Sequence, residues 1–212
     1  MKKLLQTVII LLTTVIERVI RLARAGLDKD KVVMKAAELA SECGLNNLSL
    51  KDLADSLGIK PQSLYNHIKS LDELKHAMML FAARQLTKDV TVAAVGKSGE
   101  AAVRSVAKAY YLFAINNSGL YEAMQWYNRL EDEEAAREFT DFMLVVEKVL
   151  EPYNLNDRDE QNVYCLLRSL IHGFASLAAF GGFGKNMPIE EHFDWAINAI
   201  VSNLNTLLEN NH

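Results

Sequence analysis

The sequence predicts an all-α fold in which a short three-helix front domain is followed by a longer helical rear domain. The chain has 212 residues, of which 50% are hydrophobic and 24% charged, so it can bury a real core and does not resemble a disordered chain. Its 3 prolines and 10 glycines are too few for the many turns of a β-sandwich or barrel. Apolar residues also recur every three or four positions, which is typical of amphipathic helices.

Residues 1–26 form an N-terminal extension whose helical structure the sequence leaves open. Two lysines precede an apolar run over residues 4–16, as in a secretion signal, but this run is shorter than the roughly 20 residues of a membrane helix. Four charged residues then follow: Glu17, Arg18, Arg21 and Arg24. Three interpretations remain open: an amphipathic helix on the protein body, a basic arm that touches DNA, or an upstream extension that the working protein lacks.

Residues 27–86 predict the front domain, whose helices have recognisable ends. The first helix ends at Gly44, since glycine is favoured just after a helix. Its apolar stripe consists of Val32, Val33, Ala36, Ala37, Leu39 and Ala40. The second helix begins at Ser49, which has an acid three residues later in a shortened capping box, and ends at Gly58.

The third helix is expected over residues 62–68. Pro61 suits its first turn, where the missing amide proton would be unpaired in any case. Leu64 and Ile68 would point inward, and Ser70 would cap the next helix, expected over residues 71–94. The outward face of the third helix would present short polar groups and an aromatic hydroxyl: Lys60, Gln62, Ser63, Tyr65, Asn66, His67 and Lys69.

Two short helices joined by a glycine-containing turn and braced by a preceding helix predict a helix-turn-helix, which presents its second short helix to the DNA major groove. No carboxylate occurs in residues 56–71, and the donors present there suit phosphates and base edges. The net charge of −4 divides into +4 for residues 1–27, +1 for 28–88 and −9 for 89–212, so the acidity belongs to the rear domain. The alternative is a helical hairpin in the core of a bundle.

The segments 50–54, 57–59 and 63–70 resemble the DNA-binding domain of TetR-family transcriptional regulators, and the similarity continues to about Leu86. Ile68 departs from the aromatic residue often found there, and Leu71 departs from a lysine, which weakens one backbone contact. The resemblance implies phosphate contacts for Ser49, Tyr65, His67 and Lys69, and base-edge contacts for Gln62, Ser63 and Asn66. With Lys60, these residues form the expected DNA-binding surface.

Residues 87–212 predict an effector-binding and dimerisation domain. Helical stripes run over residues 103–111 and 139–150, and a long helix with a middle rich in small residues is expected over 159–180. Near the C-terminus an apolar seam steps by four, three and four residues, as in helices that pair with a partner. We therefore assign a homodimer interface to Gly173, Phe193, Ile197, Ile200 and Leu204, in a four-helix bundle from two subunits. The alternative is packing within one chain.

The segments 168–174, 181–184 and 117–121 resemble the effector domain of a TetR subgroup named for a Trp-His-Gly signature, although no tryptophan precedes His172 and Gly173 here. This resemblance implies an inducer-binding dimer domain. Aromatic and apolar residues could line a ligand pocket, because ligand cavities combine apolar walls with few polar groups. The candidates are Tyr111, Met124, Trp126, Tyr127, Phe142, Tyr164 and His172, for each of which plain core packing is the alternative.

The leading functional hypothesis is a dimeric, cytoplasmic transcriptional regulator, a repressor released from double-stranded operator DNA by an unknown small molecule. The first alternative, guided by residues 2–25, is a membrane-associated or secreted helical protein. An enzyme is the second alternative, but the five histidines lack metal-ligand spacing and no nucleophile elbow or phosphate loop occurs. We expect no cofactor, no metal and no membrane partner. Cys43 and Cys165 lack CxxC spacing and are expected to be buried free thiols.

Overall fold

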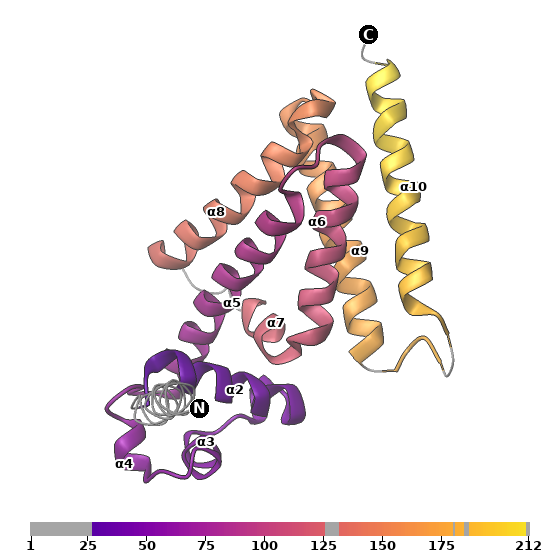
Figure 1. The fold of residues 1–212 in the computed structure, drawn as a ribbon. Helices are drawn as coiled ribbons and strands as arrows, with labels where there is room; N and C mark the ends of the chain where they lie inside the picture. The colour runs from indigo at the N-terminus through magenta and orange to yellow at the C-terminus, as the bar shows by residue number, and fades with distance from the viewer. Residues whose placement is uncertain (1–26, 126–131, 180, 185–186, 211–212) are drawn as a thin grey trace, which may run out of the picture.

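The computed structural model describes residues 27–125, 132–179, 181–184 and 187–210, and every regular element within these ranges is helical (Figure 1). The predicted all-α fold is thus confirmed. The expected extension, residues 1–26, lies outside the described residues. The helices are α2 (Lys29–Cys43), η1 (Leu45–Asn47), α3 (Leu50–Ser56), α4 (Pro61–Leu64), α5 (Leu71–Ala94), α6 (Gly99–Asn116), α7 (Ser118–Met124), α8 (Glu133–Leu150), η3 (Glu151–Tyr153), α9 (Asp157–Ala179) and α10 (Ile189–Asn210).

The predicted caps of the front helices are present. The Ser49 side chain accepts a hydrogen bond from the amide of Asp52 at the start of α3, and the Ser70 side chain accepts one from the amide of Glu73 at the start of α5. Gly44 follows α2 with a φ of 83°, a backbone conformation that glycine adopts without the strain a side chain would cause. The local sequence therefore determines where these helices start and stop.

The third helix is shorter than expected, because α4 ends at Leu64 instead of reaching Ile68. The amides of Asn66 and His67 bond to carbonyls three residues back, those of Ser63 and Leu64, so the chain tightens into turns after the first helical turn. Ile68 nevertheless reaches the core and is fully buried.

Helix α5 runs from the front domain into the rear domain, where it packs against α6, α7 and α8 (Figure 1). The domain boundary expected between residues 86 and 87 falls inside this single 24-residue helix. Buried side chains from both parts form one continuous cluster. The two domains therefore share a helix and a core.

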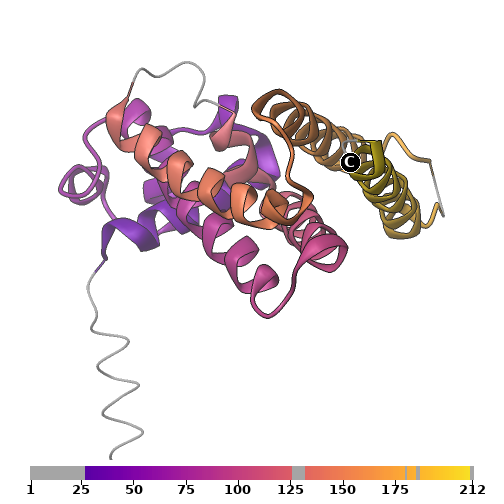
Figure 2. The same ribbon diagram turned by 90° about the horizontal axis from the view of Figure 1, so that it is seen from above.

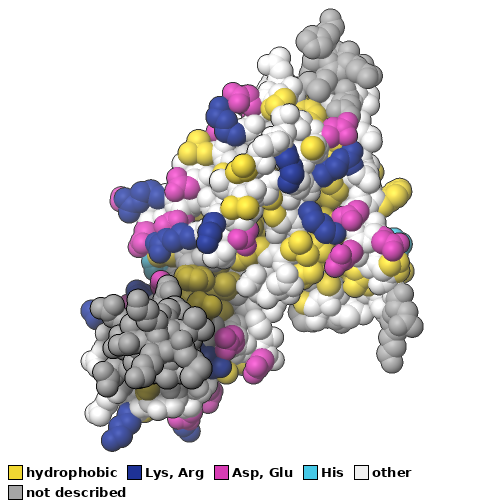
Figure 3. Space-filling model, viewed as in Figure 1, with side chains coloured by type: hydrophobic (Ala, Val, Ile, Leu, Met, Phe, Trp, Pro, Cys, Tyr) yellow, Lys and Arg dark blue, Asp and Glu magenta, His cyan; other side chains and the backbone are white. Residues whose placement is uncertain are grey.

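The last two long helices form the outer layer of the rear domain. Seen from above, α9 and α10 lie side by side at one end of the molecule (Figure 2). Helix α9 packs against α6, and α10 packs against both α6 and α9. On the face shown in Figure 3, acidic and basic side chains lie next to one another over the rear domain.

The cysteines do not lie where the sequence suggested. Cys43 and Cys165 are free, but both are exposed, so the expectation of buried thiols was wrong. Cys43 is the last residue of α2 and Cys165 lies on the outward side of α9. None of the helices in the described ranges is long and apolar enough to cross a membrane.

Candidate functional site

The turn between α3 and α4 positions the candidate DNA-reading helix. Leu53 and Ala54 of α3 are fully buried, and the amide of Ile59 bonds to the carbonyl of Ala54 at 3.1 Å. Gly58 has a φ of 66° and lets the chain reverse between the two helices. Helix α4 is thereby held at a fixed angle to α3.

The outward face of α4 and of the turns after it carries most of the predicted DNA-binding residues. Leu64 and Ile68 are buried as expected, with at most 1% of their surface exposed. Tyr65 is 52% exposed, an unusual position for an aromatic ring that packs only within the chain. The exposed polar residues beside it are Lys60, Gln62, Ser63, Asn66 and Lys69, and His67 is half-buried.

Ser49 differs from the other predicted phosphate contacts because its hydroxyl already makes two hydrogen bonds, both with Asp52. It accepts from the amide of Asp52 at 3.1 Å and donates to the Asp52 carboxylate at 2.6 Å. A phosphate would have to displace this carboxylate to receive the Ser49 proton. The start of α5 is held in a similar way, since the Lys69 amide donates to Glu73 at 2.8 Å.

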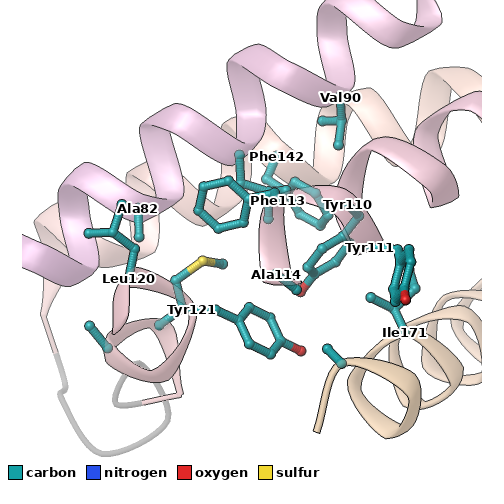
Figure 4. Packing of buried hydrophobic residues seen from close by; sticks show 14 of the residues in the cluster. Ala82, Val90, Tyr110, Tyr111, Phe113, Ala114, Leu120, Tyr121, Phe142 and Ile171 are labelled. Atoms are coloured by element: carbon teal, nitrogen blue, oxygen red, sulfur yellow. The ribbon is translucent and has the colours of Figure 1, made fainter. Parts of the chain in front are cut away.

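The rear domain contains a small apolar cavity of about 30 Å³ between α6, α8 and α9. Two of the predicted ligand residues, Phe142 and Tyr164, line it. Figure 4 shows Phe142 beside Tyr110, whose ring it meets edge-on at a centroid distance of 5.6 Å. The remaining walls come from Val103, Val106, Ala107, Tyr110, Val146, Val149, Leu150, Leu167, Arg168 and Ile171.

The structure places the other predicted ligand residues elsewhere. Tyr111 points the opposite way and stacks on Phe193 of α10, with ring centroids 4.2 Å apart. Met124 is buried in the core and His172 is exposed on α9, and neither lines the cavity. These three residues therefore do not line this cavity, because adjacent positions on a helix face different neighbours. Trp126 and Tyr127 lie outside the described residues.

Sequence reasoning missed most of the wall, including Tyr110 and Arg168. Several wall residues belong to the helical stripes already visible in the sequence, but periodicity identifies a buried face and not the gap between two faces. Tyr164, Leu167, Arg168 and Ile171 are spaced three or four residues apart, the pattern of one helix face. This spacing on α9 was the sequence signal that indicated this part of the cavity wall.

Two buried tyrosines lie at the cavity or next to it: Tyr110 lines it, and the Tyr121 ring meets that of Tyr110 at a centroid distance of 6.3 Å. Burial raises the pKa of Tyr121 to about 12, although the positive charge of Arg168 acts in the opposite direction. Burial likewise raises the pKa of Tyr110 far above its usual value. Both hydroxyls are therefore protonated at neutral pH, and that of Tyr121 lies 3.0 Å from Nδ1 of His172. In Figure 4 the Tyr121 side chain points toward the helix that carries Ile171.

Helix α7 connects this region to α2 of the front domain through closely fitted backbone. The Gly119 amide donates to the Ser41 hydroxyl at 2.9 Å, and the Leu45 amide donates to the Glu122 carboxylate at 2.8 Å. A Cβ atom on Gly119 would lie only 2.3 Å from the carbonyl oxygen of Ala37. Only glycine fits at this contact, so α2 and α7 are held together rigidly.

The apolar seam assigned to the dimer interface packs within the chain instead. Phe193, Ile197 and Leu204 are at most 3% exposed, because α10 turns this face toward α6 and α9. Their assignment to a surface between subunits was wrong. Ile200 and Gly173 are half-buried, and the large apolar side chains that α9 and α10 expose are Leu166, Leu177 and Trp195.

Comparisons with known proteins agree with this architecture. Residues 103–200 match a family described as "Tetracyclin repressor-like, C-terminal domain". The chain is 31% identical over 182 residues to the uncharacterized HTH-type transcriptional regulator YobS of Bacillus subtilis (strain 168), a match that covers 85% of this chain and 94% of that relative. It is also 32% identical over 87 residues to the class D tetracycline repressor protein of Escherichia coli, covering 41% of this chain and 39% of the repressor.

A solved structure shows the same fold at lower identity. A TetR variant from Acinetobacter baumannii AYE, crystallised in complex with minocycline, superposes with a TM-score of 0.65 at 14% identity. The match covers 86% of this chain and 98% of that protein. The arrangement of a small helical front domain and a larger rear domain is thus shared over nearly the whole length of that protein.

Proposed function

Because the chain belongs to the TetR family of helix-turn-helix transcriptional regulators, we propose that it is a repressor that a small molecule releases from operator DNA. The observation that carries this proposal is the exposed face of α4 and the following turns, which is polar, free of carboxylates and built around the outward-facing Tyr65. Amide and hydroxyl groups there suit base edges, and Lys60 and Lys69 suit phosphates. We assign the chain no catalytic role and place it in the compartment that holds the DNA.

Release from DNA requires that ligand binding in the rear cavity changes the position of α4, and α7 connects the two regions. It contacts α2 at Gly119 and Glu122, and the hydroxyl of its Tyr121 lies 3.0 Å from Nδ1 of His172 on α9. A ligand that moves Tyr110 or Arg168 would displace Tyr121 and with it α7. Helix α2 would move together with α7, because the two helices are in close contact at Gly119. The ligand thereby favours one orientation of the front domain over another.

The outward surfaces of α9 and α10 support pairing of two chains. Leu166, Leu177 and Trp195 are 48%, 47% and 72% exposed, and apolar side chains of this size gather at interfaces. Pairing through these helices would join two front domains so that two copies of α4 reach successive major grooves. The nearby His172 and Gly173 also support membership of the Trp-His-Gly subgroup, which the sequence resembles.

The DNA-binding role is tested with a Tyr65→Ala, Lys69→Ala double variant on an operator selected from randomised duplexes by the wild-type protein. At roughly 0.15 M salt we expect at least a tenfold loss of affinity, with a shallower salt dependence because phosphate contacts are lost. A matched Lys88→Ala, Val92→Ala double variant alters exposed residues on the rear half of α5 and should bind like wild type. Unchanged affinity of the first variant would refute the helix-turn-helix assignment.

A further inference from the structure

The reading segment, residues 60–69, consists of α4 and the turns that follow it, and it has few helical hydrogen bonds of its own. Helix α4 covers only Pro61–Leu64, and the amides of Asn66 and His67 bond to carbonyls three residues back. Such a short helical segment is not stable by itself and keeps one orientation only through contacts with the rest of the protein. The direction in which Tyr65 points therefore depends on what holds the two ends of this segment.

The carboxylate of Glu73 holds the far end of the reading segment. Its Oε2 accepts a hydrogen bond from the amide of Lys69 at 2.8 Å, and its Oε1 lies 3.4 Å from Nζ of Lys29 at the start of α2. The amide of Glu73 donates to the Ser70 hydroxyl at 3.0 Å. Glu73 thereby joins three elements, namely the reading segment, α2 and α5.

This arrangement differs from an ordinary capping box. In such a box, the acid at the third position of a helix bonds to the amide of the capping residue itself, which is Ser70 in α5. Glu73 instead reaches one residue further back, to Lys69 in the reading segment. The hydrogen bond from the Lys69 amide, more than any other contact, lowers the pKa of the Glu73 carboxyl below its usual value. The acceptor is thus ionised at neutral pH, which makes the hydrogen bond a strong one.

Resting on the proposed function, we propose that Glu73 is a positioning residue for operator recognition, which keeps the reading segment in the orientation that DNA requires. The near end of the segment adjoins α3, where the Ile59 amide bonds to the Ala54 carbonyl. At the far end, burial of Ile68 holds the chain against the core, but the hydrophobic effect has no direction. The hydrogen bond from Lys69 to Glu73 supplies this direction, because it weakens steeply when its geometry changes.

Loss of this contact should reduce specificity more than general attraction to DNA. The lysines of the segment would still attract phosphates in any orientation, whereas contacts with base edges require a fixed one. Glu73 is itself a carboxylate, which phosphates repel, so its favourable effect acts through the segment and not through contact with DNA.

Three substitutions of Glu73 separate its position from its charge. Affinity is measured for the selected operator and for an unrelated duplex, on samples whose folding at the assay temperature is checked by circular dichroism. Glu73→Ala should bind the operator about tenfold more weakly, as expected for one lost hydrogen bond to a charged group, and the unrelated duplex no more weakly. Glu73→Gln keeps the length and an accepting oxygen and should stay within about threefold of wild type. Glu73→Asp keeps the charge but is one methylene shorter, and should bind the operator more weakly than Glu73→Gln.

Asp72→Ala is the matched control. It removes an exposed carboxylate from the same turn of α5 but leaves the acceptor of the Lys69 amide in place, so it should bind like wild type. A double-mutant cycle with Tyr65→Ala adds a measurement that a general loss of stability would not change. Tyr65→Ala should cost less operator affinity when combined with Glu73→Ala than alone, because the ring of a misplaced segment no longer meets its target.

Three results would overturn the inference. They are unchanged operator affinity of Glu73→Ala, a loss in Glu73→Gln that Glu73→Asp does not share, and additive effects of Glu73→Ala and Tyr65→Ala. If Glu73→Ala does not fold, the comparison of Glu73→Asp with Glu73→Gln decides alone. Failure of the proposed function is distinguishable, because the wild type and Asp72→Ala would then show no preference for any selected duplex.

Discussion

The hydroxyl of Tyr121 lies 3.0 Å from Nδ1 of His172, so a hydrogen bond joins α7 to the outer helix α9. The same short helix is fitted against α2 at Gly119. Three parts of the molecule, the front domain, the cavity region and the outer layer, therefore all contact α7, a helix of seven residues. Substitutions in α7 and its neighbours test how these parts depend on one another.

Tyr121 should reduce stability at alkaline pH. Its pKa is about 12 in the folded chain, whereas an unfolded tyrosine titrates near 10, so the unfolded state binds fewer protons between these values. Its contribution is intact below pH 10 and decreases as the pH rises toward 12. Comparing urea unfolding at pH 8 and pH 11.5, Tyr121→Phe should lose about 2 kcal/mol less stability than the wild type between these two pH values. Tyr65→Phe, at an exposed tyrosine, should leave the loss unchanged.

Gly119→Ala should weaken the contact between α2 and α7. The added Cβ would meet the Ala37 carbonyl oxygen at 2.3 Å and the Ala40 Cβ at 2.9 Å, and backbone at that distance cannot yield cheaply. We expect a loss of about 1 to 3 kcal/mol in the free energy of unfolding. Gly173→Ala, at a helical glycine with open space around its Cβ position, is the control and should not lower stability. Equal effects of the two changes would argue against the tight contact.

Phe193→Ala should destabilise the single chain. The ring is fully buried, stacks on Tyr111 and meets Phe174 edge-on at 5.4 Å. Its removal leaves a cavity and should cost about 3 to 5 kcal/mol in denaturant unfolding. If the variant unfolded like wild type and changed only the association state, Phe193 would belong to a subunit interface after all.

Pairing of chains should depend on the outward side of α9 and α10. A Leu166→Glu, Trp195→Glu double variant places charges on two exposed apolar positions, and sedimentation velocity should show a monomer where the wild type is a dimer. Leu144→Glu supplies the comparison, since Leu144 is 50% exposed but lies on α8. A monomeric wild type, or a double variant that still dimerises, would contradict the proposed interface.

Local signals in the sequence were sufficient to predict the helix caps and the buried positions of the front domain. The caps at Ser49 and Ser70 and the inward positions of Leu64 and Ile68 follow from interactions within a few residues, and the structure has all of them. The shorter α4 was missed because Leu64 and Ile68 are buried four residues apart, as in a helix, although the amides of Asn66 and His67 bond to carbonyls three residues back. That burial depends on residues distant in the sequence.

The rear domain was harder to predict because its helices have more than one apolar neighbour. The seam at Phe193 has the spacing of a pairing face, but spacing does not tell whether the partner helix belongs to the same chain or to another. Tyr111 was assigned to the ligand cavity and Tyr110 was not, and the structure reverses the two. One residue rotates the side chain by about 100° around the helix, so the stripe alone does not distinguish them.

Because helix α5 is long, a small tilt at its rear end produces a large displacement at its front end. Its 24 residues extend about 36 Å at the usual rise of 1.5 Å per residue. A tilt of only 3° about its far end would therefore displace the Ser70 end by about 2 Å, more than half the length of a hydrogen bond to DNA. Two copies tilting in opposite senses would change their separation by about twice that amount, against a spacing of roughly 34 Å between successive major grooves. Packing changes too small to alter the fold would thus suffice to take both reading helices out of register with the duplex.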